Sequence, residues 1–439
     1  MPLMFTKSKL RASLIFIALS LVYRFALDIF FIQFSRDFAY YGLIYLPRSS
    51  LEIICSYLAV IIASSTIDYS TNRPSNSIHL MLFLFCFVPT SVHYSLNFNM
   101  SWEPFYGLFT FFLFVPIIRG ILSGAKNITL PTLRLKQYSQ LISLVLILGL
   151  GLIVWQYGFS FNISSITDVY DQRAEFKSVS GKGMKYIVQW IANVINVVFV
   201  LWSLVNRKYL FAGFSILLSV YLFSLGGHKS FLFVTPLAAV LYGLVKFFRE
   251  DFNIALVISL VVAVVFVLIY DLASERDYSL ISSLFIRRTI LLPSQIYFYY
   301  CDYFSTHEVN LFSQNIPIKF FVSSPYDMRI PDIIGQHYFH HKDDVYANGN
   351  VFADTYSNVG LLSYPLLAIV LPCLYSLIDW AAQRKHLAFT IPLVFMTSHV
   401  LLNSGIIVTL ITHGLFLAIV LLAFYPRNLW RIKKVVSKT

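Results

Sequence analysis

Long apolar runs recur along the chain, and they constrain its fold more than any other feature. Residues 254–270, for example, contain no charged side chain. A helix needs about 20 mostly apolar residues to cross the hydrocarbon core of a bilayer. The whole chain is 58% hydrophobic and 12% charged, whereas soluble domains carry about 25% charged residues. The sequence therefore predicts a polytopic membrane protein whose fold class is all-α.

Twelve membrane-spanning helices are expected, and residues 1–439 then form a single transmembrane domain. The expected spans are residues 13–32, 50–68, 77–95, 104–123, 139–158, 186–205, 209–225, 231–248, 253–272, 358–380, 387–405 and 406–425. An even number of spans places both termini on one side of the membrane. The N-terminal segment, the C-terminal tail and most short connections on that side are basic. Basic loops are typical of the cytoplasmic side, so both termini are predicted to be cytoplasmic.

Several cations nevertheless fall on the predicted outer side. Segment 159–185 carries Arg173, and the short turn 226–230 carries His228 and Lys229. Short outer loops usually avoid Lys and Arg. Two interpretations stay open: the charge bias is simply incomplete, or these side chains line a cationic cavity that binds an anion. The net charge of +12 does not indicate nucleic acid, because the basic residues flank apolar spans.

Residues 273–357 form the longest polar stretch of the chain. Loops longer than about 15 residues are uncommon and are usually functional. Apolar residues around Arg287 and Arg288 predict an interfacial helix along the membrane, and Pro293 predicts a break before a second, aromatic helix. The aromatic residues of that second helix include Tyr299, Tyr300 and Tyr303. They fit an interfacial aromatic belt, and they also fit a platform on which sugar rings stack.

The end of this outer segment is rich in polar side chains and leads directly into the tenth span. It contains Arg329, and it contains His337 and Asp354 as the two candidate general bases. The run HHKDD at residues 340–344 could be taken for a metal site. Consecutive residues of an extended loop point in different directions, however, so we expect a solvated loop, no metal and no other cofactor.

The motifs that bind nucleotides are absent from the sequence, so an enzyme at this face needs a donor that is already activated. Lipid-linked sugar pyrophosphates are such donors. The guanidinium group of arginine engages two phosphate oxygens at once and keeps its charge. Cations placed at the leaving group stabilise the charge that develops when the sugar–pyrophosphate bond breaks. The candidate pyrophosphate-binding residues are Arg173, Arg287, Arg288, Arg329, His228 and Lys229.

Three stretches resemble the bacterial oligosaccharide repeat-unit polymerases, the O-antigen polymerases of the Wzy type. They are LGGHKSFLF, with His228 and Lys229 where arginine is common; DQRAEFKSVSGKG, with Arg173 before a glycine; and NGNVFADTYSNVGLL, which leads into a span. The resemblance implies the all-helical fold of C-class membrane glycosyltransferases. It also implies transfer of a glycan from undecaprenyl pyrophosphate to a lipid-linked repeat unit, at the periplasmic face of the Gram-negative inner membrane. Membrane lipids, a repeat-unit flippase and a chain-length regulator are the implied partners.

Two other functions stay open at this point. An O-antigen ligase of the same fold would transfer the glycan to the lipopolysaccharide core instead. A flippase for the same lipid-linked oligosaccharide would be a transporter, and transporters usually bind their substrate near the midplane on broken helices of repeated halves. The sequence has no internal repeat, and its polar residues gather in one outer loop, which favours an enzyme.

One ion pair is expected inside the membrane. Arg24 and Asp28 lie four residues apart on the first span, so they share a face of the helix. Charged side chains within the membrane normally face the interior of the helix bundle. The pair is expected either to be structural or to line the path of the lipid.

Overall fold

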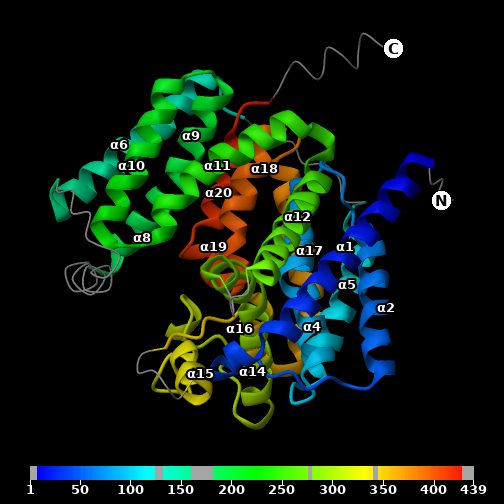
Figure 1. The fold of residues 1–439 in the computed structure, drawn as a ribbon. Coiled ribbons are helices and arrows are strands. Elements are labelled where there is room, and N and C mark those ends of the chain that lie inside the picture. The colour runs from blue at the N-terminus through cyan, green and yellow to red at the C-terminus, as the bar shows by residue number, and fades with distance from the viewer. Residues whose placement is uncertain (1–6, 124–131, 160–180, 275–278, 340–344, 428–439) are drawn as a thin grey trace.

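The computed structural model describes residues 7–123, 132–159, 181–274, 279–339 and 345–427 (Figure 1). Within these ranges the chain is predominantly helical, and the only β-pairing is an isolated bridge between Leu46 and Asn97. Eight helices of this described part are long and apolar enough to cross a membrane. The protein is therefore an all-α, multi-pass membrane protein, as the apolar runs predict.

The helices follow one another closely along the chain. Up to residue 226 they are α1 (Lys7–Phe34), η1 (Arg36–Tyr41), α2 (Ser50–Thr66), α3 (Pro74–Leu82), η2 (Phe83–Phe87), α4 (Val88–Leu96), α5 (Glu103–Leu122), α6 (Leu135–Tyr157), α8 (Lys182–Trp190), η3 (Ile191–Ile195), α9 (Asn196–Val205) and α10 (Tyr209–Gly226). The remainder are α11 (Lys229–Phe248), η4 (Arg249–Asp251), α12 (Phe252–Ala273), α13 (Leu280–Ser282), η5 (Ser283–Leu291), α14 (Leu292–Thr306), η6 (Ile318–Phe320), α15 (Ile330–Tyr338), α16 (Val351–Val359), η7 (Gly360–Leu362), α17 (Ser363–Ala381), α18 (Leu387–Ser398), η8 (His399–Leu402), α19 (Ile406–Ile411) and α20 (Leu415–Phe424).

Each of the twelve predicted spans falls on one of these helices or on a run of them. The 45-residue apolar stretch Lys229–Ala273 contains two predicted spans, α11 and α12, with η4 between them. Three further predicted spans fall on shorter apolar helices at Ser50–Thr66, Leu387–Leu402 and Leu415–Phe424, which have 17 residues or fewer. The presence of helices at these positions is confirmed, and the count of twelve crossings stays a prediction.

Three segments with the wider π-helical turn interrupt the α-helices, namely η2, η3 and η5. Pro89 follows η2, and Pro293 follows η5, each in the first turn of the next helix. Proline has no N–H and its ring crowds the preceding turn, so a wider turn before it lets the helix continue. The break predicted at Pro293 is therefore wrong: residues 280–306 form one uninterrupted helical rod.

We call residues 283–338 of the outer segment the roof (η5, α14, η6, α15 and their connections). It packs into one end of the helix bundle, where the Ser294 hydroxyl of α14 donates to the carbonyl of Cys86 over 3.3 Å. Figure 1 shows α14, α15 and α16 gathered at one end of the molecule, with α20 and the start of α1 directed toward the other end. Helix α14 packs against α16, α15 and α4. The roof therefore covers that end of the helix bundle, and we call this end the roof face.

Connections that carry basic residues meet at the opposite end, which we call the basic face. There, the Thr71 hydroxyl donates a hydrogen bond to the carbonyl of Glu250. The Leu133 amide donates to the carbonyl of Phe424 over 3.1 Å. The segment after α2 is thus joined to the turn after α11, and the segment before α6 is joined to the end of α20. Spans that cross the membrane in alternating directions bring every second connection to the same face, as seen here.

The predicted ion pair inside the membrane is confirmed. Arg24 Nε lies 2.9 Å from Asp28 Oδ1, and both side chains are buried. The Nη atoms of Arg24 donate to the hydroxyls of Ser91 and Ser95, each over 2.6 Å. The Tyr57 hydroxyl donates to Asp28 Oδ2 over 2.6 Å. These partners lie on α1, α2 and α4, so the buried charges hold three helices together.

Candidate functional site

Asp354 is one of the two candidate general bases. Its carboxylate is partly buried and has no hydrogen-bond or ion-pair partner among the described residues. It lies in the first turn of α16, where the Asn350 side chain caps the helix by accepting from the amides of Phe352 and Ala353. The Asp354 side chain is half-buried. No described residue donates a hydrogen bond to its carboxylate oxygens or forms an ion pair with them. Such a carboxylate has free lone pairs for an incoming hydroxyl group.

Gly405 lies directly against the Asp354 carboxylate. It precedes α19, and a Cβ atom built on it would lie 1.9 Å from Asp354 Oδ2. Only glycine lets the backbone of this turn come so close to the carboxylate. The Asp354 side chain is thereby held between α16 and the start of α19, next to the roof.

The aromatic residues of α14 pack the roof together. The Tyr300 side chain is 2% exposed, and its hydroxyl donates to the carbonyl of Ala347 over 2.9 Å. Burial raises the pKa of Tyr300, and the nearby Asp354 carboxylate acts in the same direction. Tyr299 stacks on Tyr338 at 4.2 Å between ring centroids, and Tyr303 stacks on His307 at 3.9 Å. These stacks cover one face of Tyr299 and of Tyr303, and their use for sugar stacking stays a prediction.

The two adjacent arginines of η5 differ in exposure. Arg287 is 8% exposed, donates to the Ser283 hydroxyl over 3.0 Å and lies over the ring of Phe38 at 4.8 Å. Arg288 is exposed. The 3.0 Å bond ties Arg287 to the preceding helical turn, whereas Arg288 can reach a ligand at the roof face.

Two further candidates lie at the two ends of α15. Arg329, at its start, is exposed and forms an ion pair with Asp332, with 2.8 Å between Nε and Oδ2. His337, at its end, is exposed and packs edge-on against Tyr303 at 5.3 Å. Arg329 therefore already has an anionic partner, and His337 lies on the outside of the roof.

The turn with His228 and Lys229 joins α10 to α11, as the sequence predicts. Gly227 ends α10 in the left-handed conformation (φ 61°), and His228 precedes the first turn of α11. The His228 ring packs on Phe231 at 5.1 Å, and Lys229 is exposed. Arg173 and the HHKDD run at residues 340–344 lie outside the described residues. The convergence of the six candidate cations on one pocket stays a prediction.

A polar network around Glu103 was missed by the sequence reasoning. The Tyr356 hydroxyl donates to Glu103 Oε2 over 2.8 Å, and the Tyr364 hydroxyl donates to the Glu103 carbonyl over 3.2 Å. The Tyr297 hydroxyl donates to Tyr364 over 3.0 Å. The network joins α5, α14 and α17 to α16, the helix that carries Asp354. The sequence did contain an indication of Glu103 as a site residue, since it is a carboxylate at the predicted outer end of a span.

Comparison with known proteins adds no relative. No protein-family model, curated protein or solved structure matches this chain.

Proposed function

We propose that this protein is a membrane glycosyltransferase that polymerises lipid-linked oligosaccharide repeat units at the roof face. In this proposal the roof face is periplasmic, and the membrane is the inner membrane of a Gram-negative bacterium. The observation that carries the proposal is the Asp354 carboxylate, half-buried beside the roof and free of partners among the described residues. The all-helical, multi-pass fold is the setting that such a reaction needs.

The proposed step is a displacement at the anomeric carbon of the donor glycan. Asp354 accepts the proton of an acceptor-sugar hydroxyl while that oxygen bonds to the anomeric carbon. The bond from this carbon to the pyrophosphate oxygen breaks, and the electron pair leaves with undecaprenyl pyrophosphate. Arg288 and Arg287 of η5, together with Arg173, are the proposed cations that stabilise the departing charge. His337 is disfavoured as the base because it lies on the outside of the roof.

The test is a lipopolysaccharide gel of a deletion strain complemented with variants of the full chain. Asp354→Asn is expected to abolish the ladder of long chains and leave single repeat units on the core, because an amide cannot accept the proton. Asp327→Asn is the matched control, since Asp327 is an exposed carboxylate of the roof. It is expected to leave the ladder intact.

The pattern on the gel separates this proposal from its rivals. Loss of a ligase would remove even the single repeat units from the core, and loss of a flippase would leave them inside the cell. A normal ladder from correctly inserted Asp354→Asn protein would contradict the role of Asp354.

A further inference from the structure

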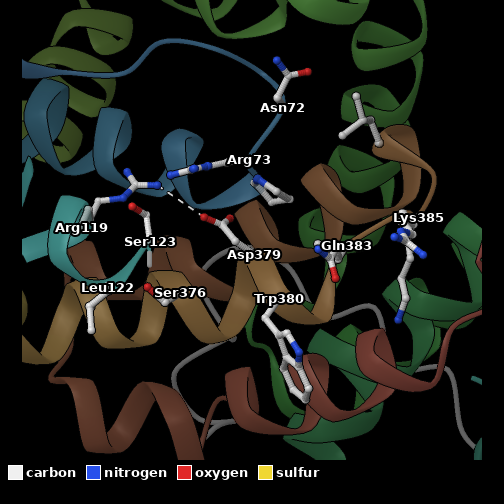
Figure 2. Close-up of a pocket in the computed structure, with 14 residues that line it drawn as sticks. Asn72, Arg73, Arg119, Leu122, Ser123, Ser376, Asp379, Trp380, Gln383 and Lys385 are labelled. Atoms are coloured by element: carbon white, nitrogen blue, oxygen red, sulfur yellow. Dashed lines mark hydrogen bonds and ion pairs between the residues drawn. The ribbon is translucent and has the colours of Figure 1, made fainter. Parts of the chain in front are cut away.

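A cationic hollow of about 410 Å³ lies on the basic face, away from the roof. It is formed where α5 and α17 end and α3 begins, and Figure 2 shows its lining. The charged lining residues are Arg73, Arg119, Asp379, Arg384 and Lys385. This lining contains four cations and one carboxylate, so a formal excess of positive charge faces the hollow.

The one carboxylate is already engaged. Asp379 accepts from the Ser75 amide over 3.1 Å and from the Ser75 hydroxyl over 2.6 Å. Arg119 Nη2 lies 3.4 Å from Asp379 Oδ2, an ion pair drawn as a dashed line in Figure 2. Arg119 also donates to the Ser75 hydroxyl over 2.7 Å. These bonds fix Arg119 and neutralise Asp379.

The other cations have no acidic partner within ion-pair distance in the described part of the chain. Arg73 and Arg384 are exposed and take part in none of the described ion pairs. Lys385 is 5% exposed, and its Nζ donates to the carbonyls of Leu422 and Ala423. Two guanidinium groups at the rim thus keep their donors for a ligand.

A second hollow of about 230 Å³ adjoins the first, since Arg73, Arg119 and Ser123 line both. Its lining adds one acid, Asp68, and it reaches His79. His79 is 2% exposed, and neither of its ring nitrogens has a hydrogen-bond partner among the described residues. Buried polar atoms nearly always have partners, so this imidazole is available to a polar ligand.

We propose that these adjoining hollows form a binding site for a phosphate group. Arginine forks bind phosphate oxygens through paired, charge-assisted hydrogen bonds. His79, which packs against Phe111, Phe112 and Tyr375, supplies a further donor at depth. The phosphate can belong to an anionic lipid headgroup or be free phosphate, and the chemistry is the same. The proposal does not depend on the polymerase proposal, because the two sites lie on opposite faces.

The test measures ligand-induced stabilisation of the purified full chain in neutral detergent. One arm adds phosphatidylglycerol against phosphatidylcholine, and the other adds inorganic phosphate against chloride at equal ionic strength. The rise in Tm is expected to saturate with at least one phosphate-bearing ligand. The double variant Arg73→Gln/Arg384→Gln is expected to raise the half-saturating concentration about tenfold or more.

A matched control removes the same charge from the same face outside both hollows. Arg207→Gln/Arg249→Gln suits this purpose, because both residues are exposed and, like Arg384, lie in turns with positive φ. It is expected to change the half-saturating concentration less than about twofold. A response confined to phosphatidylglycerol would identify a lipid headgroup, and a response to both ligands would show that phosphate suffices. The proposal would be overturned if Tm showed no saturable rise in either arm. It would also be overturned if both double variants raised the half-saturating concentration equally.

Discussion

Two buried histidines on the span Pro74–Leu96 differ in how their ring nitrogens are satisfied. His93 Nε2 lies 3.0 Å from the Leu291 carbonyl and bonds to it, whereas both nitrogens of His79 lack partners among the described residues. A lost partner costs a buried polar group about 1–3 kcal/mol. His93 therefore ties the span to the roof helix, and His79 carries a stability cost that a ligand can offset.

The two histidines respond oppositely to replacement by phenylalanine. His79→Phe is expected to stabilise the chain by about 1 kcal/mol in the absence of phosphate and anionic lipid, because it removes two unsatisfied polar atoms from a site already lined by Phe112. His93→Phe is expected to destabilise it by about 1–2 kcal/mol, because the hydrogen bond to the Leu291 carbonyl is lost. Denaturation in detergent checks both variants. Equal destabilisation by the two would contradict this account of His79.

Lys385 makes stability depend on pH. Burial, followed by the nearby Arg427 charge, lowers its pKa from 10.5 to about 7. Between these values the unfolded chain binds more protons than the folded chain, so stability rises with pH across this window and levels off below it. The rise is expected to be about 1 kcal/mol from pH 7 to pH 8, in buffer without phosphate. Lys385→Met is expected to remove this rise, and an unchanged pH profile would contradict the assignment.

At the residue scale, local spacing predicted some contacts and could not predict others. Arg24 and Asp28 share a helix face, so their pairing followed from a separation of four residues. Glu103 meets Tyr356 across 253 positions, and no local pattern encodes that contact. The sequence predicted only a topology signal from the cations around the hollows on the basic face, because a basic loop has the same composition whether or not a cavity lies beneath it.

At the element scale, helix positions were predictable and helix irregularities were not. Apolar runs place α5, α6 and α10, since each must match the thickness of a bilayer. The π-helical segment η5 packs against α4, and its Arg287 lies over the Phe38 ring of η1. The periodicity of the sequence does not reveal such contacts. Pro293 alone suggested a break in the helix. The wider π-helical turn before it lets the helix continue from residue 280 to residue 306.

The close contact between α16 and the start of α19 gives a prediction at the element scale. Gly405→Ala is expected to displace the Asp354 carboxylate, because its Cβ would lie 1.9 Å from Oδ2. The lipopolysaccharide ladder should be lost or strongly shortened while the protein remains inserted. Gly213→Ala is the control, since a Cβ on Gly213 of α10 meets nothing within 4 Å. A full ladder from Gly405→Ala would show that this close approach has no role in activity.

At the scale of the whole molecule, the charge bias predicts which face lies in the cytoplasm. The basic face holds the turns with Arg207, Arg249 and Arg384, and the roof lies at the other end. This orientation is testable with a membrane-impermeant thiol reagent on intact spheroplasts. Asp327→Cys in the roof is expected to react, and Arg384→Cys is expected to react only after lysis. The reverse pattern would place the roof in the cytoplasm and exclude the proposed reaction.

The polymerase proposal is tested most directly with purified protein in liposomes supplied with an undecaprenyl-pyrophosphate-linked repeat unit. The wild-type chain is expected to produce a series of longer lipid-linked glycans and to release undecaprenyl pyrophosphate. Asp354→Asn should produce neither, and Asp327→Asn should produce both. Failure of the correctly folded wild-type chain to extend any such repeat unit, or equal extension by Asp354→Asn, would contradict the account.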